Sequence, residues 1–279
     1  MLKGALALFL ALVLLSFPLT GIAEEEMLRV ELVALNVGKA DAIVAFVGDK
    51  TYLIDAGTKK GYDRLEAALD ELGVTRLDGV FLTHTDKDHG GGLKKLAESD
   101  IGIGAFYASS IFCEKSPDKH QAVRAAKERG TEVQWLNAGD VVDIAPDCRF
   151  EVLSPLVPDE DCENNNSLVM RLVTPEGTAL LTGDMEWDAE RLLLSSGVEL
   201  KSDVLKVAHH GRDDATGEAF ARAVSPQIAL ISTDSAEEPR SPAMAVLAAL
   251  EDSEVYVTED FDLGIRVRLE GGKATLIED

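Results

Sequence analysis

Residues 79–92 read GVFLTHTDKDHGGG. The apolar run at residues 79–83 predicts a short buried strand, and the residues after it include four potential metal ligands, His84, Asp86, Asp88 and His89. Imidazole nitrogens and carboxylate oxygens suit divalent ions such as zinc or manganese, and a tight loop can turn them toward one point. The glycines at 90–92 allow a close approach of the backbone. Taken alone, an ordinary polar loop would explain the stretch equally well.

Two further apolar runs end in residues with the same chemistry. Residues 179–182 lead into Gly183 and Asp184, and residues 204–208 lead into His209 and His210. Four of the five histidines therefore fall in two tight clusters at predicted strand ends. The fifth, His120, stands alone in a helical stretch and is expected at the surface. Three separate strand ends thus present metal-ligand chemistry.

Hydrophobic periodicity predicts a succession of strands and helices. Helices are expected at residues 62–72, 92–98, 119–129, 187–196, 218–224 and 243–250. Strands are expected at residues 28–35, 42–47, 51–54, 79–83, 132–136, 150–153, 168–173, 179–182, 204–208, 228–232, 255–258, 265–269 and 274–277. Because no linker rich in Pro, Gly or Ser interrupts them, we expect one domain over residues 28–279, with two sheets flanked by helices.

Residues 1–23 have the pattern of a signal peptide. They contain Lys3, an apolar run and the small residues Gly21-Ile22-Ala23, followed by acidic residues at 24–26. We expect cleavage near Glu24 and a secreted or extracytoplasmic mature protein without a membrane span. An uncleaved membrane anchor is the alternative, although the apolar run is shorter than the roughly 20 residues of a spanning helix.

Three cysteines, Cys113, Cys148 and Cys162, allow at most one disulfide bond. Disulfides persist outside the cytosol, and Cys148 with Cys162 is the pair to test. Three unpaired thiols are the equal alternative.

The formal net charge is −23, from 50 acidic and 27 basic residues. The long-range field repels polyanions, which weighs against a dedicated nucleic-acid-binding protein. A phosphodiester substrate is still compatible with this charge, because a bound divalent ion can dominate the charge within a local site.

Several motifs in order resemble the metallo-β-lactamase superfamily, and above all the nuclease-like domain of ComEC-type DNA-uptake proteins and its free-standing relatives. The motifs are LNVGKADAIV, TYLIDAG, HTDKDHGGG, NNNSLVMRL, LLTGDMEWDAERLL and DVLKVAHHG. The resemblance runs from about Val30 to the C-terminus. It implies an α/β fold, a four-layer αββα sandwich, in which the three ligand clusters meet at one edge between the sheets.

The resemblance also implies two divalent ions, zinc or manganese, with named ligands. It assigns His84 and Asp86 to the first ion, Asp88, His89 and His210 to the second, and Asp184 to the bridge between them. His209 would donate a proton or contact substrate, and the order of His209 and His210 is left open. Asp55 is expected to orient a ligand by hydrogen bonding. Asp88, through its ion, and His209 are the expected catalytic residues.

The chain departs from the family pattern at three places. Asp86 stands where the superfamily commonly has a histidine, and the NNNS segment at residues 164–167 offers amides and a hydroxyl where a further histidine is usual. Asp213 and Asp214 follow the histidine pair, and their charge is unfavourable for a phosphate backbone. The segment Glu238-Pro239-Arg240-Ser241-Pro242 stands where relatives tend to have a histidine before the proline. The first site would therefore be rich in oxygen, which favours weak or exchangeable metal, including manganese.

The function implied is that of a secreted metal-dependent hydrolase that acts on a phosphodiester through a metal-activated water. DNA and a small phosphorylated molecule are alternative substrates. A non-catalytic or weakly active extracellular metal-binding module is the alternative function, and a β-lactam hydrolase fits the motifs less well.

Overall fold

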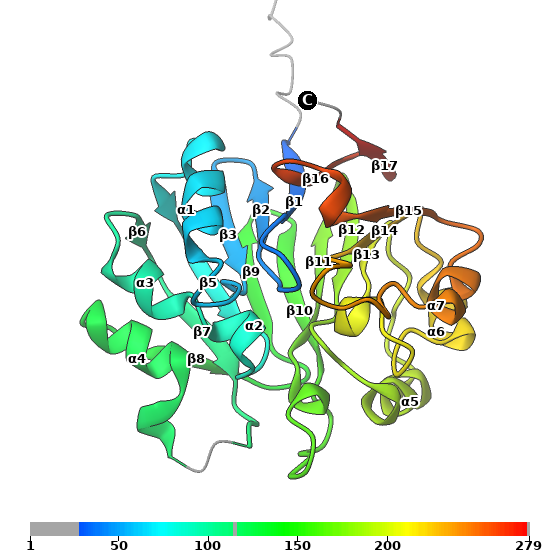
Figure 1. Ribbon diagram of the computed structural model, residues 1–279, viewed down its shortest axis with the longest axis horizontal. Helices are drawn as coiled ribbons and strands as arrows, with labels where there is room; N and C mark the ends of the chain where they lie inside the picture. Colours follow the sequence, from blue (N-terminus) through cyan, green and yellow to red (C-terminus); the bar gives the residue numbers. More distant parts are fainter. Residues whose placement is uncertain (1–27, 114–115, 278–279) are drawn as a thin grey trace, which may run out of the picture.

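The computed structural model describes residues 28–113 and 116–277 (Figure 1). The expected signal peptide at residues 1–23 and its cleavage near Glu24 lie outside the described residues. None of the helices that residues 28–113 and 116–277 form is long and apolar enough to cross a membrane.

The first large sheet begins as an antiparallel meander and continues with parallel strands. Gly48, at φ +61°, makes the tight turn between the second and third strands of the meander. The sheet has the order β17-β16-β1-β2-β3-β5-β7-β8. Its strands are β1 (Val30–Leu35), β2 (Ile43–Val47), β3 (Lys50–Ile54), β5 (Gly79–Leu82), β7 (Phe106–Ser109), β8 (Val133–Leu136), β16 (Gly264–Glu270) and β17 (Lys273–Leu276).

The second large sheet has seven strands in the order β15-β14-β13-β12-β11-β10-β9. Its first four strands in this order run parallel, and the other neighbours pair antiparallel. The strands are β9 (Val141–Ala145), β10 (Cys148–Ser154), β11 (Val169–Thr174), β12 (Gly177–Leu181), β13 (Val204–Lys206), β14 (Ile228–Ile231) and β15 (Glu254–Val257). A separate pair joins β4 (Arg76–Leu77) to β6 (Gly102–Ile103).

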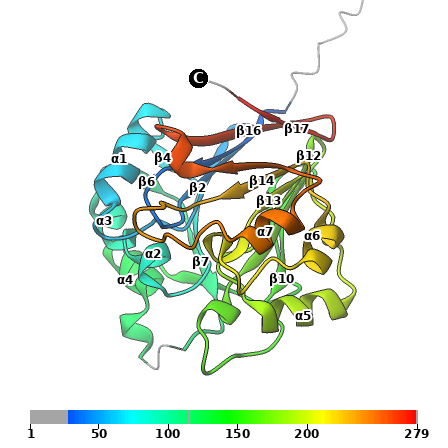
Figure 2. The same cartoon turned by 45° about the vertical axis from the view of Figure 1, so that its right-hand side comes forward.

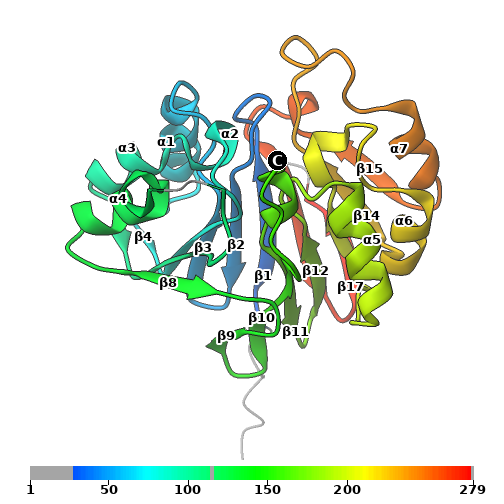
Figure 3. The same ribbon diagram turned by 90° about the horizontal axis from the view of Figure 1, so that it is seen from below.

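Helices cover the outer faces of both sheets and give four layers, α, β, β and α (Figure 3). The first face carries α1 (Tyr62–Glu71), α3 (Leu93–Glu98) and α4 (Gln121–Glu128), and the second carries α5 (Trp187–Ser196), α6 (Glu218–Val224) and α7 (Met244–Ala249). Figure 2 shows α6 and α7 side by side over the second sheet. Shorter helices are α2 (Lys87–Gly90), η1 (Pro117–Lys119), η2 (Asn164–Asn166), η3 (Ala208–Gly211) and η4 (Thr258–Asp260). The expected αββα sandwich is confirmed.

The main core lies between the two sheets and follows from strand alternation. On β1, Leu32 faces this core, whereas its neighbour Val33 packs with the helices on the other side. Aromatic rings of both sheets meet there, because Phe81 of β5 contacts Phe150 of β10 at a centroid distance of 4.9 Å. Burial of such large side chains contributes about 1.5–3 kcal/mol each, so this interface fixes how the sheets sit on each other.

The structure contains several short elements that periodicity does not predict, and it differs from the expectation for His120. The prediction does not include β4, β6, β7, β9 and α2, although it does include other strands of similar length. The expectation that His120 lies at the surface is wrong: its side chain is buried between Phe112 and Trp135, with centroid distances of 4.7 and 5.1 Å. All three cysteines are free thiols, so the Cys148–Cys162 pair does not form.

Candidate metal centre

The candidate site lies at the carboxyl ends of parallel strands from both sheets. β3 leads into Asp55 and β5 into the loop with His84, while β12 and β13 lead into Asp184 and the histidine pair. Ligand sites commonly form outside the carboxyl ends of parallel strands. The loop at residues 83–92, called the metal loop below, needs glycine where its backbone approaches that of Ala56. A Cβ on Gly92 would lie 2.1 Å from the carbonyl oxygen of Ala56.

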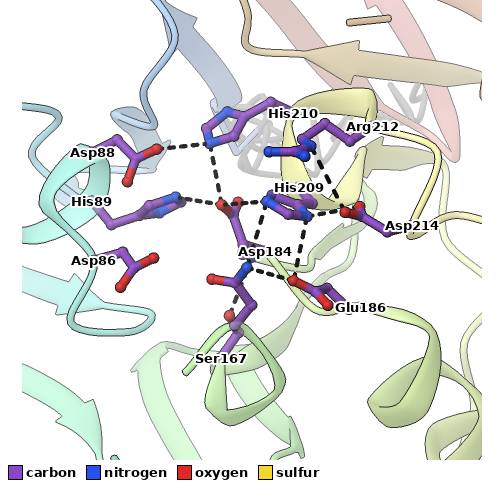
Figure 4. Close-up of polar contacts among 12 residues, drawn as sticks. Asp86, Asp88, His89, Ser167, Asp184, Glu186, His209, His210, Arg212 and Asp214 are labelled. Carbon is purple, nitrogen blue, oxygen red and sulfur yellow. Dashed lines mark hydrogen bonds and ion pairs between the residues drawn. The ribbon is translucent and has the colours of Figure 1, made fainter. Parts of the chain in front are cut away.

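Four residues offer ligand atoms that all lie within 4.8 Å of one another, namely Asp88, His89, Asp184 and His210. The Nε2 atoms of His89 and His210 lie 3.1 and 3.2 Å from the same oxygen of Asp184, its Oδ2 (Figure 4). His210 Nε2 also lies 3.5 Å from Asp88 Oδ2. The structure thus brings together the ligand set expected for the second ion, with Asp184 at its centre.

Several polar atoms in this cluster have no hydrogen-bond partner among the described residues. They are Nε2 of His84, His89 and His210 and Oδ1 of Asp184, all buried. An unpaired polar group in the interior costs about 1–3 kcal/mol, so such atoms need an explanation. A divalent ion fits the atoms of His89, His210 and Asp184, because with Asp88 they supply two imidazole nitrogens and two carboxylates, a donor set that suits zinc and manganese, and His84 lies beside them.

The residues expected for the first ion lie beside this cluster but are less closely gathered. His84 is buried, and its ring centroid lies 4.1 Å from that of His89. The Asp86 side chain is half exposed, and its Oδ2 lies 3.9 Å from His84 Nε2. Asp86 does not belong to the four-ligand group found among the described residues.

Hydrogen bonds to the opposite ring nitrogens orient the two clustered histidines. His89 Nδ1 lies 2.7 Å from Asp55 Oδ2, as expected for Asp55, and the same carboxylate accepts from the backbone and hydroxyl of Thr83. His210 Nδ1 donates to the Ser232 carbonyl at 2.8 Å. Such partners fix the ring orientation of metal-binding histidines and leave Nε2 facing the site.

The backbone of three site residues adopts the left-handed conformation, which residues other than glycine rarely take. The φ angles are +61° for Asp55, +46° for His209 and +56° for His210. Such conformations cost energy and persist where the surrounding structure imposes them. In η3 both histidines take this conformation, and His210 enters the four-ligand cluster whereas His209 belongs to a separate group with Glu186 and Asp214.

His209 lies beside the cluster and is held by carboxylates of its own. Its Nδ1 lies 2.8 Å from Asp214 Oδ1 and 3.6 Å from Glu186 Oε1, and its Nε2 lies 4.0 Å from Asp184 Oδ2 (Figure 4). Arg212 Nε lies 3.7 Å from the other oxygen of Asp214. Asp214 therefore faces His209 and Arg212, which offsets the expected repulsion of phosphate at this position.

Burial and neighbouring charges shift the pKa values of the site. Burial lowers the pKa of His84 to about 3, and the charge of His89 adds to this effect, so the ring is neutral at pH 7 as a metal ligand must be. Burial alone would lower the pKa of His89, but the carboxylates of Asp184 and Asp55 raise it well above its usual value. Burial raises the pKa of Asp184, and His210 and His89 outweigh this, holding it well below its usual value. The carboxylates of Asp184 and Asp55 therefore favour positive charge beside them, and a bound divalent cation would supply that charge in place of protons on the rings.

Sequence reasoning gave no role to three residues that touch the site. Asp41 lies 3.5 Å from His210 Nδ1, and Glu186 and Asp214 surround His209. Asp41 stood in the quoted motif LNVGKADAIV, so a signal was present for it. Glu186 likewise stood in the quoted motif LLTGDMEWDAERLL, whereas Asp214 was considered only for its repulsion of phosphate.

Known proteins agree with this architecture. Residues 35–235 match the sequence profile of the Metallo-beta-lactamase superfamily. The chain belongs to this superfamily. It is similar to ComE operon protein 3 of Bacillus subtilis, at 33% identity over 193 residues, and to competence protein ComA of Neisseria gonorrhoeae, at 30% over 213 residues. The alignments cover 68% and 76% of this chain but 24% and 28% of those proteins, so this metallo-beta-lactamase superfamily chain spans about a quarter of their length. These competence relatives confirm the resemblance to ComEC-type proteins.

Two solved structures share the fold of this chain at low sequence identity. The metallo-beta-lactamase fold protein YhfI from Bacillus subtilis has a TM-score of 0.55 at 14% identity, covering 85% of this chain and 98% of that one. CmlA, a diiron beta-hydroxylase from Streptomyces venezuelae, has a TM-score of 0.56 at 11% identity, covering 88% of this chain and 54% of that one. These likenesses show the fold alone.

Proposed function

We propose that this protein is a secreted metal-dependent hydrolase that acts on a phosphodiester. The observation that carries the proposal is the four-ligand cluster, in which buried nitrogen and oxygen atoms without hydrogen-bond partners converge around Asp184. The superfamily is generally hydrolytic, and the similar competence proteins support a phosphodiester as the substrate class.

We infer two ligand sets that would share one carboxylate. Asp88, His89 and His210 would hold one divalent ion, His84 and Asp86 the other, and Asp184 would bridge them. A bound ion supplies an activated water and stabilises negative charge on the substrate oxygens. The set of Asp88, His89, His210 and Asp184 has two nitrogens and two carboxylates, which favour zinc or manganese.

The chain's own groups orient the substrate and move the proton. Asp214 holds His209 through Nδ1, which directs Nε2 toward the Asp184 side, where the ring can protonate the leaving oxygen. Lys39 Nζ lies 2.5 Å from Asp88 Oδ2, which places a positive charge at the edge of the cluster. With Arg212, it offers local attraction for phosphate oxygens inside a chain of net charge −23.

Metal analysis coupled to a hydrolysis screen tests the proposal. Purified protein should bind two ions per chain and turn over bis(p-nitrophenyl) phosphate, and nitrocefin should not be hydrolysed. Single-stranded DNA and a cyclic dinucleotide then separate the two substrate alternatives. Zero or one ion without turnover of any phosphodiester would favour the non-catalytic metal-binding module. The position of Asp86, half exposed and outside the four-ligand cluster, supports that alternative.

Export of the protein is the second part of the proposal. The leader pattern at residues 1–23 supports cleavage near Glu24 and release of a soluble mature chain whose residues 28–279 form one domain. Mass spectrometry of the protein from culture medium and membranes checks this. An intact leader on a membrane-bound product would contradict it.

A further inference from the structure

A buried ion pair joins the two sheets directly beside the candidate metal centre. Lys206 Nζ lies 2.7 Å from Asp41 Oδ2, and the two side chains are 1% and 2% exposed. Lys206 ends β13 of the seven-stranded sheet, whereas Asp41 lies in the loop between β1 and β2 of the eight-stranded sheet. Lys206 Nζ also donates to the Val207 carbonyl at 2.9 Å. Burying such a pair is often no more stabilising than apolar residues of the same volume, so stability alone does not explain it.

Asp41 contacts the candidate centre through both of its carboxylate oxygens. Oδ1 accepts a hydrogen bond from the Ser232 hydroxyl and lies 3.5 Å from His210 Nδ1. Oδ2, which pairs with Lys206, lies 3.9 Å from His89 Nδ1. Its backbone N–H donates to the Asp88 carbonyl at 3.1 Å. One side chain thus lies behind two histidines that come from different sheets.

The Nδ1 atoms of these histidines have two candidate acceptors each. His210 Nδ1 lies 2.8 Å from the Ser232 carbonyl and 3.5 Å from Asp41 Oδ1, and His89 Nδ1 lies 2.7 Å from Asp55 and 3.9 Å from Asp41. Asp41 is a stronger acceptor than the Ser232 carbonyl that faces His210, and it is of the same kind as the Asp55 carboxylate that faces His89. The Lys206 ammonium holds Asp41 and neutralises it, so each ring keeps its shorter partner and directs Nε2 toward Asp184.

We propose that Lys206 is a positioning residue for the metal centre, acting through Asp41 to set the ring orientations of His89 and His210. This inference rests on the proposed metal-dependent function. It predicts that Lys206, which touches no ligand atom of the cluster, controls metal affinity and coordination geometry.

Cobalt titration of the full-length protein tests the inference without using activity. Lys206→Met should weaken Co²⁺ binding roughly 10- to 100-fold, the range typical of lost partners behind metal ligands, and should change the visible absorption bands of bound cobalt. Lys206→Arg keeps the charge and should restore most of the affinity. Lys127→Met, the same change at an exposed position of α4, should bind cobalt as the wild type does.

A double-mutant cycle decides whether Lys206 acts through Asp41. In the Asp41→Asn background, the Lys206→Met change should have little further effect on cobalt affinity. This background also removes the buried negative charge that Lys206→Met alone would leave unpaired and that could unfold the protein. Additive losses would overturn the inference, as would a folded Lys206→Met protein with wild-type affinity and spectrum. If the wild type itself binds no cobalt, zinc or manganese, the proposed function fails together with this inference, whereas normal wild-type binding unaltered by Lys206→Met overturns this inference alone.

Discussion

His89 and Asp55 face each other in the buried centre, with Nδ1 of the ring 2.7 Å from Oδ2 of the carboxylate. The same carboxylate accepts two hydrogen bonds from Thr83, so Asp55 is fixed by the strand that delivers the metal loop. The orientation of one ligand is therefore set by a residue that comes from a different strand end.

Substitution Asp55→Asn should weaken metal binding about 10- to 100-fold. An amide has one accepting oxygen, so it cannot serve both Thr83 and His89 as the carboxylate does. Isothermal titration with Zn²⁺ measures the affinity, and Asp49→Asn, at a side chain that is 84% exposed, is the matched control. Equal affinity of the Asp55 variant and the wild type would contradict the assigned role.

Substitution Asp184→Asn should remove metal from both ligand sets and abolish turnover together. The amide keeps the size of the side chain but loses the charge that faces His89 and His210, and it cannot bridge two cations. Elemental analysis gives the ions per chain, and Asp86→Asn should by comparison weaken mainly the first site. Two retained ions with wild-type phosphodiester hydrolysis would rule out the bridging role.

Substitutions at two adjacent carboxylates should separate the role of His209 from that of the metal ligands. Asp214→Asn removes the charge that holds His209 Nδ1 at 2.8 Å and should lower kcat about 10- to 100-fold while leaving metal stoichiometry unchanged. Asp213→Asn is the neighbouring control: its side chain is exposed, and we expect normal metal content and, with less repulsion, equal or better affinity for a polyanion. Metal loss in Asp214→Asn would instead place His209 among the ligands.

Glu31 should make the stability of the fold depend on acid pH. Burial raises the pKa of this carboxyl, but three arginines outweigh it and lower the pKa to about 2. Arg29, Arg266 and Arg268 each lie 2.8 Å from its oxygens. Because the folded pKa lies below the usual value of 4.5, the stabilisation is complete above pH 4.5 and is lost as the pH falls toward 2.

Urea unfolding at several pH values measures this contribution. Glu31→Gln should cost about 1–3 kcal/mol at pH 7, and its free energy of unfolding should fall less steeply than that of the wild type between pH 4.5 and 2. The arginines are partly exposed, which keeps the effect at the lower end of this range. Glu128→Gln, at an exposed position of α4, should unfold as the wild type does, and parallel pH profiles for Glu31→Gln and wild type would refute the expectation.

The sequence by itself determined the layered α/β architecture and the kinds of ligand. Apolar runs with period two or near four are dictated by which faces are buried, so most strands and helices could be placed from the chain alone. His84, Asp86, Asp88 and His89 follow a buried strand, and a loop in that position can point polar groups at one site. The ordered motifs supplied the superfamily, which the sequence profile over residues 35–235 bears out.

Only the tertiary structure decided which side chains meet. The choice of His210 over His209 for the ligand cluster depends on left-handed backbone angles at both residues, which no residue pattern reveals. The contacts of Asp41 with Lys206 and Ser232 join positions that are 165 and 191 residues apart, and the burial of His120 depends on Phe112 in the loop after β7 and on Trp135 of β8. The Asp41 contacts arise when the two sheets pack face to face, and the His120 contacts arise when α4 packs beside β7 and β8; in both cases packing fixes distances that separation along the chain does not reveal.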